Sequence, residues 1–333
     1  MKLYRHSVFL LLFLSGLGYS EDFITSALHA RPVAMGGAFT AMEAGLENTL
    51  FNPACMSLTS QLDNSLNVYI NPIGAASAIL HRTELSTRTA WDAKDWLSVV
   101  GLFVRSLSFA RPVLQAAVIL SEELPANPGR SGQAVAAEGI LDWNYHSAAF
   151  RITLAKQVSI GFTGYCFNLI DGMEVRRHVG SSYGILMRPS ETFSAGLSYF
   201  NLPDKADSLM LLQHRISNKS INLGFVYRPI RKLNLALDFR NVSEEDNNST
   251  NEVHAGVEFY ATHFIALRAG YFRQNNEKID TFSAGCGLSD FRTFASQRER
   301  FVLSNIIVNY GVVAEKQVDK PSFIHYLTFL LRF

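Results

Sequence analysis

The chain has few charged residues: Asp, Glu, Lys and Arg make up 18% of its 333 residues, against about 25% in an average soluble domain. Basic and acidic residues nearly balance, at 30 and 29, for a formal charge of +1. Without a positive excess there is no broad electrostatic attraction to nucleic acid, so DNA or RNA binding is disfavoured. With 48% hydrophobic residues the chain is also too apolar to be disordered.

Cysteines are scarce too, and their spacing excludes the usual cysteine-based sites. Cys55, Cys166 and Cys286 lie far apart in the sequence and form no CxxC pair. Neither a structural zinc site nor a disulfide framework fits this spacing. We interpret the three residues as unpaired small hydrophobic side chains.

Catalytic motifs are the third absence. We find no nucleophile elbow of the GxSxG type, no HExxH and no GxGxxG, and the nine histidines show no metal-ligand spacing. We therefore expect no enzyme activity, no cofactor and no metal.

Long hydrophobic runs are missing beyond residue 20, so we expect no helical membrane span there. The N-terminus itself is different. Lys2 and Arg5 precede an uncharged, mostly apolar run over residues 7–17, and small residues follow up to Ser20. This order predicts a secretory signal peptide over residues 1–20, cleaved after Ser20. The apolar run is shorter than the about 20 residues of a spanning helix, so a retained anchor is disfavoured.

What recurs along the rest of the chain is strict alternation of apolar and polar residues. In residues 231–240, Leu233, Leu235, Leu237 and Phe239 fall on one face of a strand, and Asp238 and Arg240 fall on the other. The same period of two appears in residues 147–154, 193–199, 221–228 and 253–260. Each segment predicts a strand with one apolar face.

The connections between these strands fall into two classes. Short turns are expected at residues 156–157, 188–190, 228–231 and 261–262, and long polar loops at 171–180, 201–220, 241–251, 274–280 and 289–300. Short turns at one end and long loops at the other are typical of outer-membrane barrels. A sheet that spans lipid must close into a barrel, because every strand edge must be paired there.

The predicted fold class is therefore all-β, a transmembrane antiparallel barrel of about 14 strands over residues 61–333. A secreted antiparallel sandwich is the alternative fold. Its strands would alternate as well. It has no need of two classes of connection.

The C-terminal segment reads as a last strand. Phe323, Leu327, Phe329, Leu331 and the terminal Phe333 share one face. A C-terminal aromatic residue on an alternating strand resembles the signal that the outer-membrane assembly machinery recognises. Phe329, Leu331 and Phe333 are therefore predicted to form an assembly signal.

The segment before the strands predicts a compact plug. Gly36 and Gly37 permit positive φ or a close backbone approach, and Asn52 followed by Pro53 marks a turn. Between them, small residues and good helix formers indicate short helices that must pack on something larger. The lumen of a barrel would serve.

Residues 35–39 (MGGAF) with Ala41, and residues 52–54 (NPA), resemble the N-terminal hatch of FadL-like outer-membrane proteins, the long-chain fatty-acid transporter family that includes a PorV-like branch. Two departures are residues 43–48, where the family has an acidic stretch, and Cys55, where it commonly has Gly or Ala. The resemblance implies a hatch over residues 21–60 inside the lumen and a chain located in the outer membrane. It also implies a channel for long-chain fatty acids or similar hydrophobic molecules, in contact with outer-membrane lipid.

The predicted ligand and gate residues combine this hatch with the polar strand faces. They are Gly36, Gly37, Phe39, Asn52, Pro53, Arg151, Arg228, Arg240 and Arg268, beside the acids Asp238 and Glu258. An inward arginine would hold a carboxylate ligand by charge-assisted hydrogen bonds. Two alternatives stay open: a ladder of arginines and acids that only stiffens a wet interior, and a PorV-like scaffold that binds protein partners instead of a small molecule.

Overall fold

The computed structural model describes residues 22–24, 28–58, 65–80, 86, 91, 93–123, 144–171, 174–202, 210–211, 214–215, 219–242, 252–262, 265–274, 279–288, 306–316 and 321–333. The predicted signal peptide, residues 1–20, lies outside these residues.

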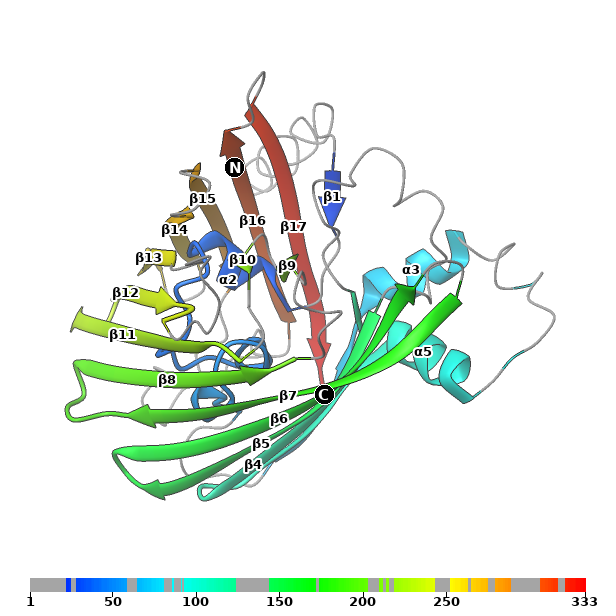
Figure 1. The fold of residues 1–333 in the computed structure, drawn as a ribbon, viewed down its shortest axis with the longest axis horizontal. Coiled ribbons are helices and arrows are strands. Elements are labelled where there is room, and N and C mark those ends of the chain that lie inside the picture. The colour runs from blue at the N-terminus through cyan, green and yellow to red at the C-terminus, as the bar shows by residue number, and fades with distance from the viewer. Residues whose placement is uncertain are drawn as a thin grey trace, which may run out of the picture.

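The described residues form one closed antiparallel sheet, a barrel of 14 strands (Figure 1). Each strand pairs with the next along the barrel, and β17 closes the ring on β2 through Leu331 opposite Ile70 and Arg332 opposite Tyr69. The predicted barrel of about 14 strands is confirmed, and a two-layer sandwich is excluded. The strands are β2 (Ser65–Ile70), β3 (Val104–Ala110), β4 (Leu114–Glu123), β5 (Asn144–Ala155), β6 (Val158–Asp171), β7 (Glu174–Met187), β8 (Phe193–Asn201), β11 (Ile221–Ile230), β12 (Leu233–Arg240), β13 (Glu252–Tyr260), β14 (Ile265–Gln274), β15 (Ile279–Leu288), β16 (Ile306–Lys316) and β17 (Pro321–Arg332).

The two faces of the wall have opposite character. On β12, Leu235, Leu237 and Phe239 point outward and are 37–38% exposed, whereas Asp238 and Arg240 point inward and are at most 2% exposed. A soluble sheet would bury the apolar face. The inverted arrangement fits a wall whose outer surface meets hydrocarbon, so the alternation marks a transmembrane barrel.

Two predicted connections are wrong. Residues 171–180 were expected to form a long loop, but β6 runs to Asp171 and β7 starts at Glu174 as its hairpin partner. These strands extend into a charged stretch, and the charge alone indicated a loop. Residues 289–300 were expected on the long-loop side, but β15 ends at the short-turn end, because Leu288 lies opposite Ile265.

The letters of the GxSxG motif do occur once, in strand β7, contrary to the sequence-based expectation. Residues 180–184 (GSSYG) match the letters of GxSxG, but they lie inside the continuous strand β7. A nucleophile elbow needs a sharp strand-to-helix turn that exposes the serine. Ser182 is instead buried and lies within 2.8 Å of the hydroxyl of Tyr165, so these letters form no elbow.

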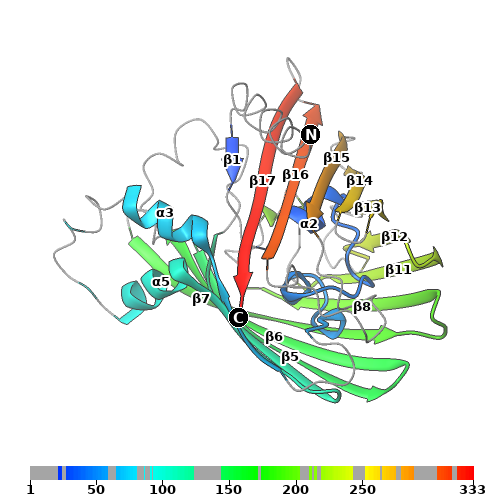
Figure 2. The same ribbon diagram turned by 180° about the vertical axis from the view of Figure 1, so that it is seen from behind.

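Two helices interrupt the predicted all-strand region of residues 61–333. α3 (Pro72–Leu80) and α5 (Ala93–Phe103) join β2 to β3, contact each other, and lie beside the first strands of the sheet (Figures 1 and 2). Among the described helices, none has the length and hydrophobicity to cross a membrane. Neither helix was predicted, because at 9 and 11 residues both are shorter than the apolar runs that indicate a membrane span.

Residues 28–58, here called the inner segment, lie against the polar inner face of the barrel (Figure 1). The segment contains α2 (Ala30–Ala34) and the 3-10 turns η1 (Leu46–Thr49) and η2 (Pro53–Cys55). α2 contacts β14 to β17, and η2 contacts β5 to β7, so the segment bridges two sides of the wall. Just before it, β1 (Asp22–Ile24) pairs in parallel with β17. A small hairpin of β9 (Met210–Leu211) and β10 (His214–Arg215) completes the described strands.

Candidate functional site

The inner segment is bound to the wall mainly through its own backbone. The carboxylate of Asp238 on β12 accepts hydrogen bonds from the backbone N–H groups of Phe39 and Thr40, both at 2.8 Å. All three residues are buried. Buried N–H groups without partners are costly, so Asp238 supplies acceptors that the short, irregular segment cannot supply for itself.

The tight turn at Gly36 and Gly37 is held in the same way from β12 and β13. Both glycines have positive φ, +62° and +77°, which the sequence predicted as one of two uses for this pair. The turn aims its two carbonyl groups at the wall. Nδ1 of His254 donates to the oxygen of Gly36 at 2.6 Å, and Arg240 donates to the oxygen of Gly37.

Glu258 on β13 joins the inner segment to the wall through a buried ion cluster. Its carboxylate receives two hydrogen bonds from Arg31 of α2, both at 2.9 Å, and one from Arg268 at 2.8 Å. Asn234 and Tyr260 also donate to it. Burial lowers the pKa of Arg31, but Glu258, Tyr260 and Glu47 together outweigh burial and hold this pKa above its ordinary value. Arg31 is therefore charged.

Asn52 and Pro53 anchor the other half of the inner segment. The Asn52 amide donates to three carbonyl groups, of Thr40 within the segment at 2.7 Å and of Ile185 and Leu197 on the wall at 3.1 and 3.3 Å. Its oxygen caps η2 by accepting from the N–H of Ala54, and Pro53 starts that turn.

Two arginines of the wall hold the acidic part of the inner segment. Arg151 and Arg188 donate to the same oxygen of Glu43, at 3.0 and 2.8 Å. Arg151 also donates to the backbone oxygen of Met56. Glu43 is thus tied to the wall at β5 and just after β7.

Glycines on the wall let the inner segment approach closely. A Cβ added to Gly184 would lie 1.9 Å from the Asn52 side chain, and one added to Gly270 would lie 1.9 Å from the backbone nitrogen of Gly36. Other inward glycines meet the segment in the same way. This set, here called the glycine belt, is Gly161, Gly184, Gly196, Gly224, Gly256, Gly270, Gly285 and Gly311.

The structure places the predicted arginines in networks of partners. Arg151 and Arg240 bind the inner segment, Arg268 binds Glu258, and Arg228 donates to Ser194 at 3.3 Å. Of these four, Arg151 and Arg268 form ion pairs with acids, Glu43 and Glu258. The predicted assembly residues Phe329, Leu331 and Phe333 lie on the outward face of β17.

Several residues that hold the inner segment escaped the sequence analysis. The Glu122 carboxylate accepts from the N–H of Leu28 at 3.2 Å, and the Ser283 hydroxyl accepts from the N–H of Gly36 at 2.9 Å. The others are Arg31, Glu43, Arg188 and His254. His254 and Ser283 lie on the polar face of alternating strands, which is the signal that could have found them. Arg31 and Glu43 stand outside any strand pattern and carry no such signal.

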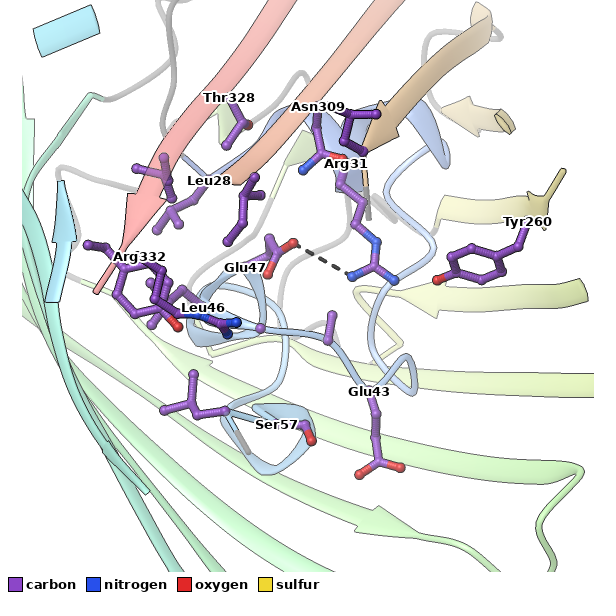
Figure 3. A pocket seen from close by; sticks show the side chains of 17 residues that line it. Leu28, Arg31, Glu43, Leu46, Glu47, Ser57, Tyr260, Asn309, Thr328 and Arg332 are labelled. Carbon is purple, nitrogen blue, oxygen red and sulfur yellow. Dashed lines mark ion pairs between the residues drawn. The ribbon is translucent and has the colours of Figure 1, made fainter. Parts of the chain in front are cut away.

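A pocket lies between the inner segment and the wall near the C-terminal end of β17 (Figure 3). Its volume is about 80 Å³, and it is partly open to solvent. Apolar side chains from the segment and from β15 to β17 line one part of it, and Arg31, paired with Glu47 at 3.7 Å, lines another. The apolar lining includes Leu28, Leu46, Leu58, Leu288, Ile307 and Leu330.

Cys55 offers a direct measure of whether the inner segment stays in place. Its side chain is fully buried, and its thiol donates to the oxygen of Thr40 at 3.3 Å. Burial raises the pKa of this thiol, which leaves little reactive thiolate. In a chain carrying Cys166→Ser and Cys286→Ser, we expect a hydrophilic maleimide to label Cys55 at least about 100-fold more slowly than in the unfolded chain. Rapid labelling of the folded barrel would contradict this packing.

No family model matches this sequence, and no curated protein matches it either. Among solved structures, the Ralstonia pickettii toluene transporter TbuX matches with a TM-score of 0.44 at 9% identity, over 92% of this chain and 97% of that chain. A triple mutant of the Rhodopseudomonas blastica porin matches with a TM-score of 0.35 at 10% identity, over 68% and 75%. The barrel assignment therefore stands on the strand pairing described above.

Proposed function

We propose that this chain is an outer-membrane channel for small hydrophobic or amphipathic molecules, gated by the inner segment. The observation that carries the proposal is the pocket, lined by both apolar and polar groups, between the inner segment and the wall. Its volume of about 80 Å³ is below the range of about 300–1,000 Å³ of small-molecule sites. A solute larger than a few atoms therefore enters only when the inner segment moves.

The inner segment suits a gate because hydrogen bonds and ion pairs from single side chains hold it. Asp238 and Glu258 bind it from the wall, and its own Asn52 binds wall carbonyl groups at a third place. Such contacts can break one at a time, whereas a ladder of strand pairing would break only as a unit. A solute that displaces part of the segment would open a path beside it.

The lining of the pocket indicates the class of solute. Leucine and isoleucine side chains would contact a hydrocarbon part, and Tyr260, Asn309 and Thr328 offer polar groups to a head group. The charges of Arg31 and Arg332 are matched by those of Glu43 and Glu47, which also line the pocket. Long-chain fatty acids belong to this class, and selection would depend more on the chain than on the carboxylate.

Filling the pocket tests the proposal. Ile307 points into it, and its neighbour Val308 lies on the outward face of β16. We expect Ile307→Trp to weaken binding of long-chain fatty acids at least about tenfold, because the indole removes space the ligand needs, while Val308→Trp, which meets lipid, leaves binding unchanged. Native mass spectrometry of the folded barrel with mixed fatty acids measures binding, and liposome uptake measures transport.

Two outcomes would count against the channel. Equal binding and uptake in both variants would exclude this pocket from the path. A folded wild-type barrel that neither binds nor transports fatty acids or uncharged hydrocarbons would favour the PorV-like scaffold instead, and a search for its protein partners would follow.

A further inference from the structure

The barrel wall has a stretch where two neighbouring strands are too short to cross a bilayer. β2 has six residues and β3 has seven, whereas β4, β5 and β6 have 10, 12 and 14. A spanning strand needs about 9–11 residues. The short strands lie together at the C-terminal end of β17, since Ile70 pairs with both Leu331 and Val104. Beyond them, among the described residues, the free edge of β17 pairs only with the three residues of β1, so most of the wall there must be completed by something other than a strand.

The helices α3 and α5 occupy that place. α5 ends at Phe103 and β3 begins at Val104, so the helix continues the line of the strand. α5 packs on β4 and on α3, and α3 in turn contacts β17 (Figures 1 and 2). The approach to β4 is close: a Cβ added to Gly101 would lie 2.5 Å from the Cβ of Ser121. The helix pair thus fills the wall between β4 and β17.

Side chains pair the edge of β4 that β3 leaves uncovered. Pairing with β3 reaches Ile119, and beyond it Arg105 donates to the backbone oxygens of Leu120 and Ser121. On its other side, the N–H of Ser121 donates to Nδ1 of His146 at 3.1 Å. Backbone groups within hydrocarbon need partners inside the protein. Arg105 provides them where a strand would otherwise stand.

The polarity of α5 is inverted relative to a helix in water. Trp96, Leu97, Val100 and Phe103 are 58%, 42%, 47% and 41% exposed, respectively. The buried side carries Asp95, Ser98 and Gly101, with Asp95 6% and Ser98 1% exposed, and one large apolar residue, Leu102, which packs on Ala78 of α3. An amphipathic helix in water presents its polar face to solvent. Here the apolar face is outside, as it is on the strands.

This apolar face continues the outer band of the barrel. Leu107 of β3 and Val118 of β4 point outward beside it and are 45% and 42% exposed. Trp96 also lies 5.1 Å from Trp91, ring to ring, and tryptophan is enriched where proteins meet the membrane interface. The outward side chains of β3 and β4 and the exposed face of α5 together form one apolar surface, and none of the side chains named is polar.

We propose that α5, supported by α3, is a helical section of the transmembrane wall, and that its face of Trp96, Leu97, Val100 and Phe103 binds the acyl chains of the bilayer. The helix is about 16 Å long, so it covers about half of the hydrocarbon layer, and β3 covers the rest. This proposal does not depend on the proposed channel function, because it concerns the lipid-facing outside of the barrel and not the lumen.

The test uses the fluorescence of Trp96 in the full-length folded barrel. The sequence has three tryptophans, Trp91, Trp96 and Trp143, so Trp91→Phe with Trp143→Phe leaves Trp96 alone. In liposomes with lipids brominated along the acyl chain, we expect about a twofold loss of Trp96 emission relative to plain lipids, and little quenching by aqueous iodide. A heat-dependent gel shift confirms that the barrel is folded.

Two results would overturn the proposal. Quenching by iodide but not by brominated lipid would place the helix pair in water. Protection from both quenchers, together with cross-linked dimers, would mean that a second copy of the chain covers the face.

A spin label provides an independent measurement if the tryptophan variant folds poorly. In the chain carrying Cys166→Ser and Cys286→Ser, a nitroxide is attached at Val100→Cys or, as the aqueous control, at Glu191→Cys in the exposed β7–β8 turn. Buried Cys55 is not labelled under folded conditions. We expect oxygen to relax the label at position 100 more strongly than a soluble nickel complex, and the reverse at 191. The same order of accessibility at both positions would overturn the proposal.

Discussion

Glu258→Gln is expected to speed maleimide labelling of Cys55 by at least about 100-fold. Glutamine keeps the size of the side chain but removes the charge that Arg31 and Arg268 share. Removing one partner of a buried ion pair costs about 3–5 kcal/mol, because the remaining charge is left in a poorly solvated place. Arg31 keeps only the longer pair with Glu47, at 3.7 Å, and it avoids the rest of this cost by leaving the lumen together with α2. The inner segment should therefore be released while the wall stays closed.

The measurement is the labelling rate of Cys55 in the Cys166→Ser and Cys286→Ser chain, in liposomes, with the gel shift as the check on folding. Glu191→Gln is the matched control, since it makes the same chemical change at an exposed turn and should leave the rate unchanged. An unchanged rate in Glu258→Gln would mean that the ion cluster does not hold the inner segment.

Gly270→Ala is expected to displace the turn at Gly36 and to raise solute leakage through the barrel. The new methyl group would lie 1.9 Å from the backbone nitrogen of Gly36 and 2.3 Å from the carbonyl carbon of Met35, and neither atom belongs to a flexible side chain. Overpacking a filled interior costs about 1–3 kcal/mol. The segment can avoid this cost by moving inward, so we expect labelling of Cys55 to rise about 10- to 100-fold.

Gly164→Ala is the control for this change. Gly164 is also a strand glycine, but its added Cβ would meet only the ring of Phe162, at 3.8 Å, which is an ordinary contact. Leakage of a small hydrophilic dye from liposomes is measured beside the labelling. If Gly270→Ala and Gly164→Ala behave alike, the glycine belt does not determine how closely the segment sits.

Alternation was sufficient to predict the barrel because each strand has one face toward lipid and the other toward the polar lumen. On β12, the outward Leu237 and the inward Asp238 differ in chemistry for that reason, and the period of two is visible in the sequence. The same signal failed at residues 171–180, where β6 and β7 continue into a charged stretch. It failed again at α5, whose inverted pattern has the period of a helix and is only 11 residues long.

The candidate site was harder to predict than the fold. The inward positions of Asp238, Arg240 and Glu258 follow from their strands, but their partners do not, because those partners are backbone groups of a segment without regular structure. The glycine pair at 36–37 indicated a backbone with positive φ or a close approach. That its carbonyl groups would meet His254 and Arg240 depends on register between segments more than 200 residues apart, which no local pattern encodes.

The position of the inner segment has a consequence for the order of assembly. The segment precedes every barrel strand in the chain, and it lies across the lumen in contact with both sides of the wall. The ring closes between β2 and β17, the first and last strands to be synthesised. If β2 and β17 paired first, the inner segment would have to enter a closed lumen in which acids and arginines already paired with one another. We therefore expect the segment to be in place against Asp238 and Glu258 before the seam closes.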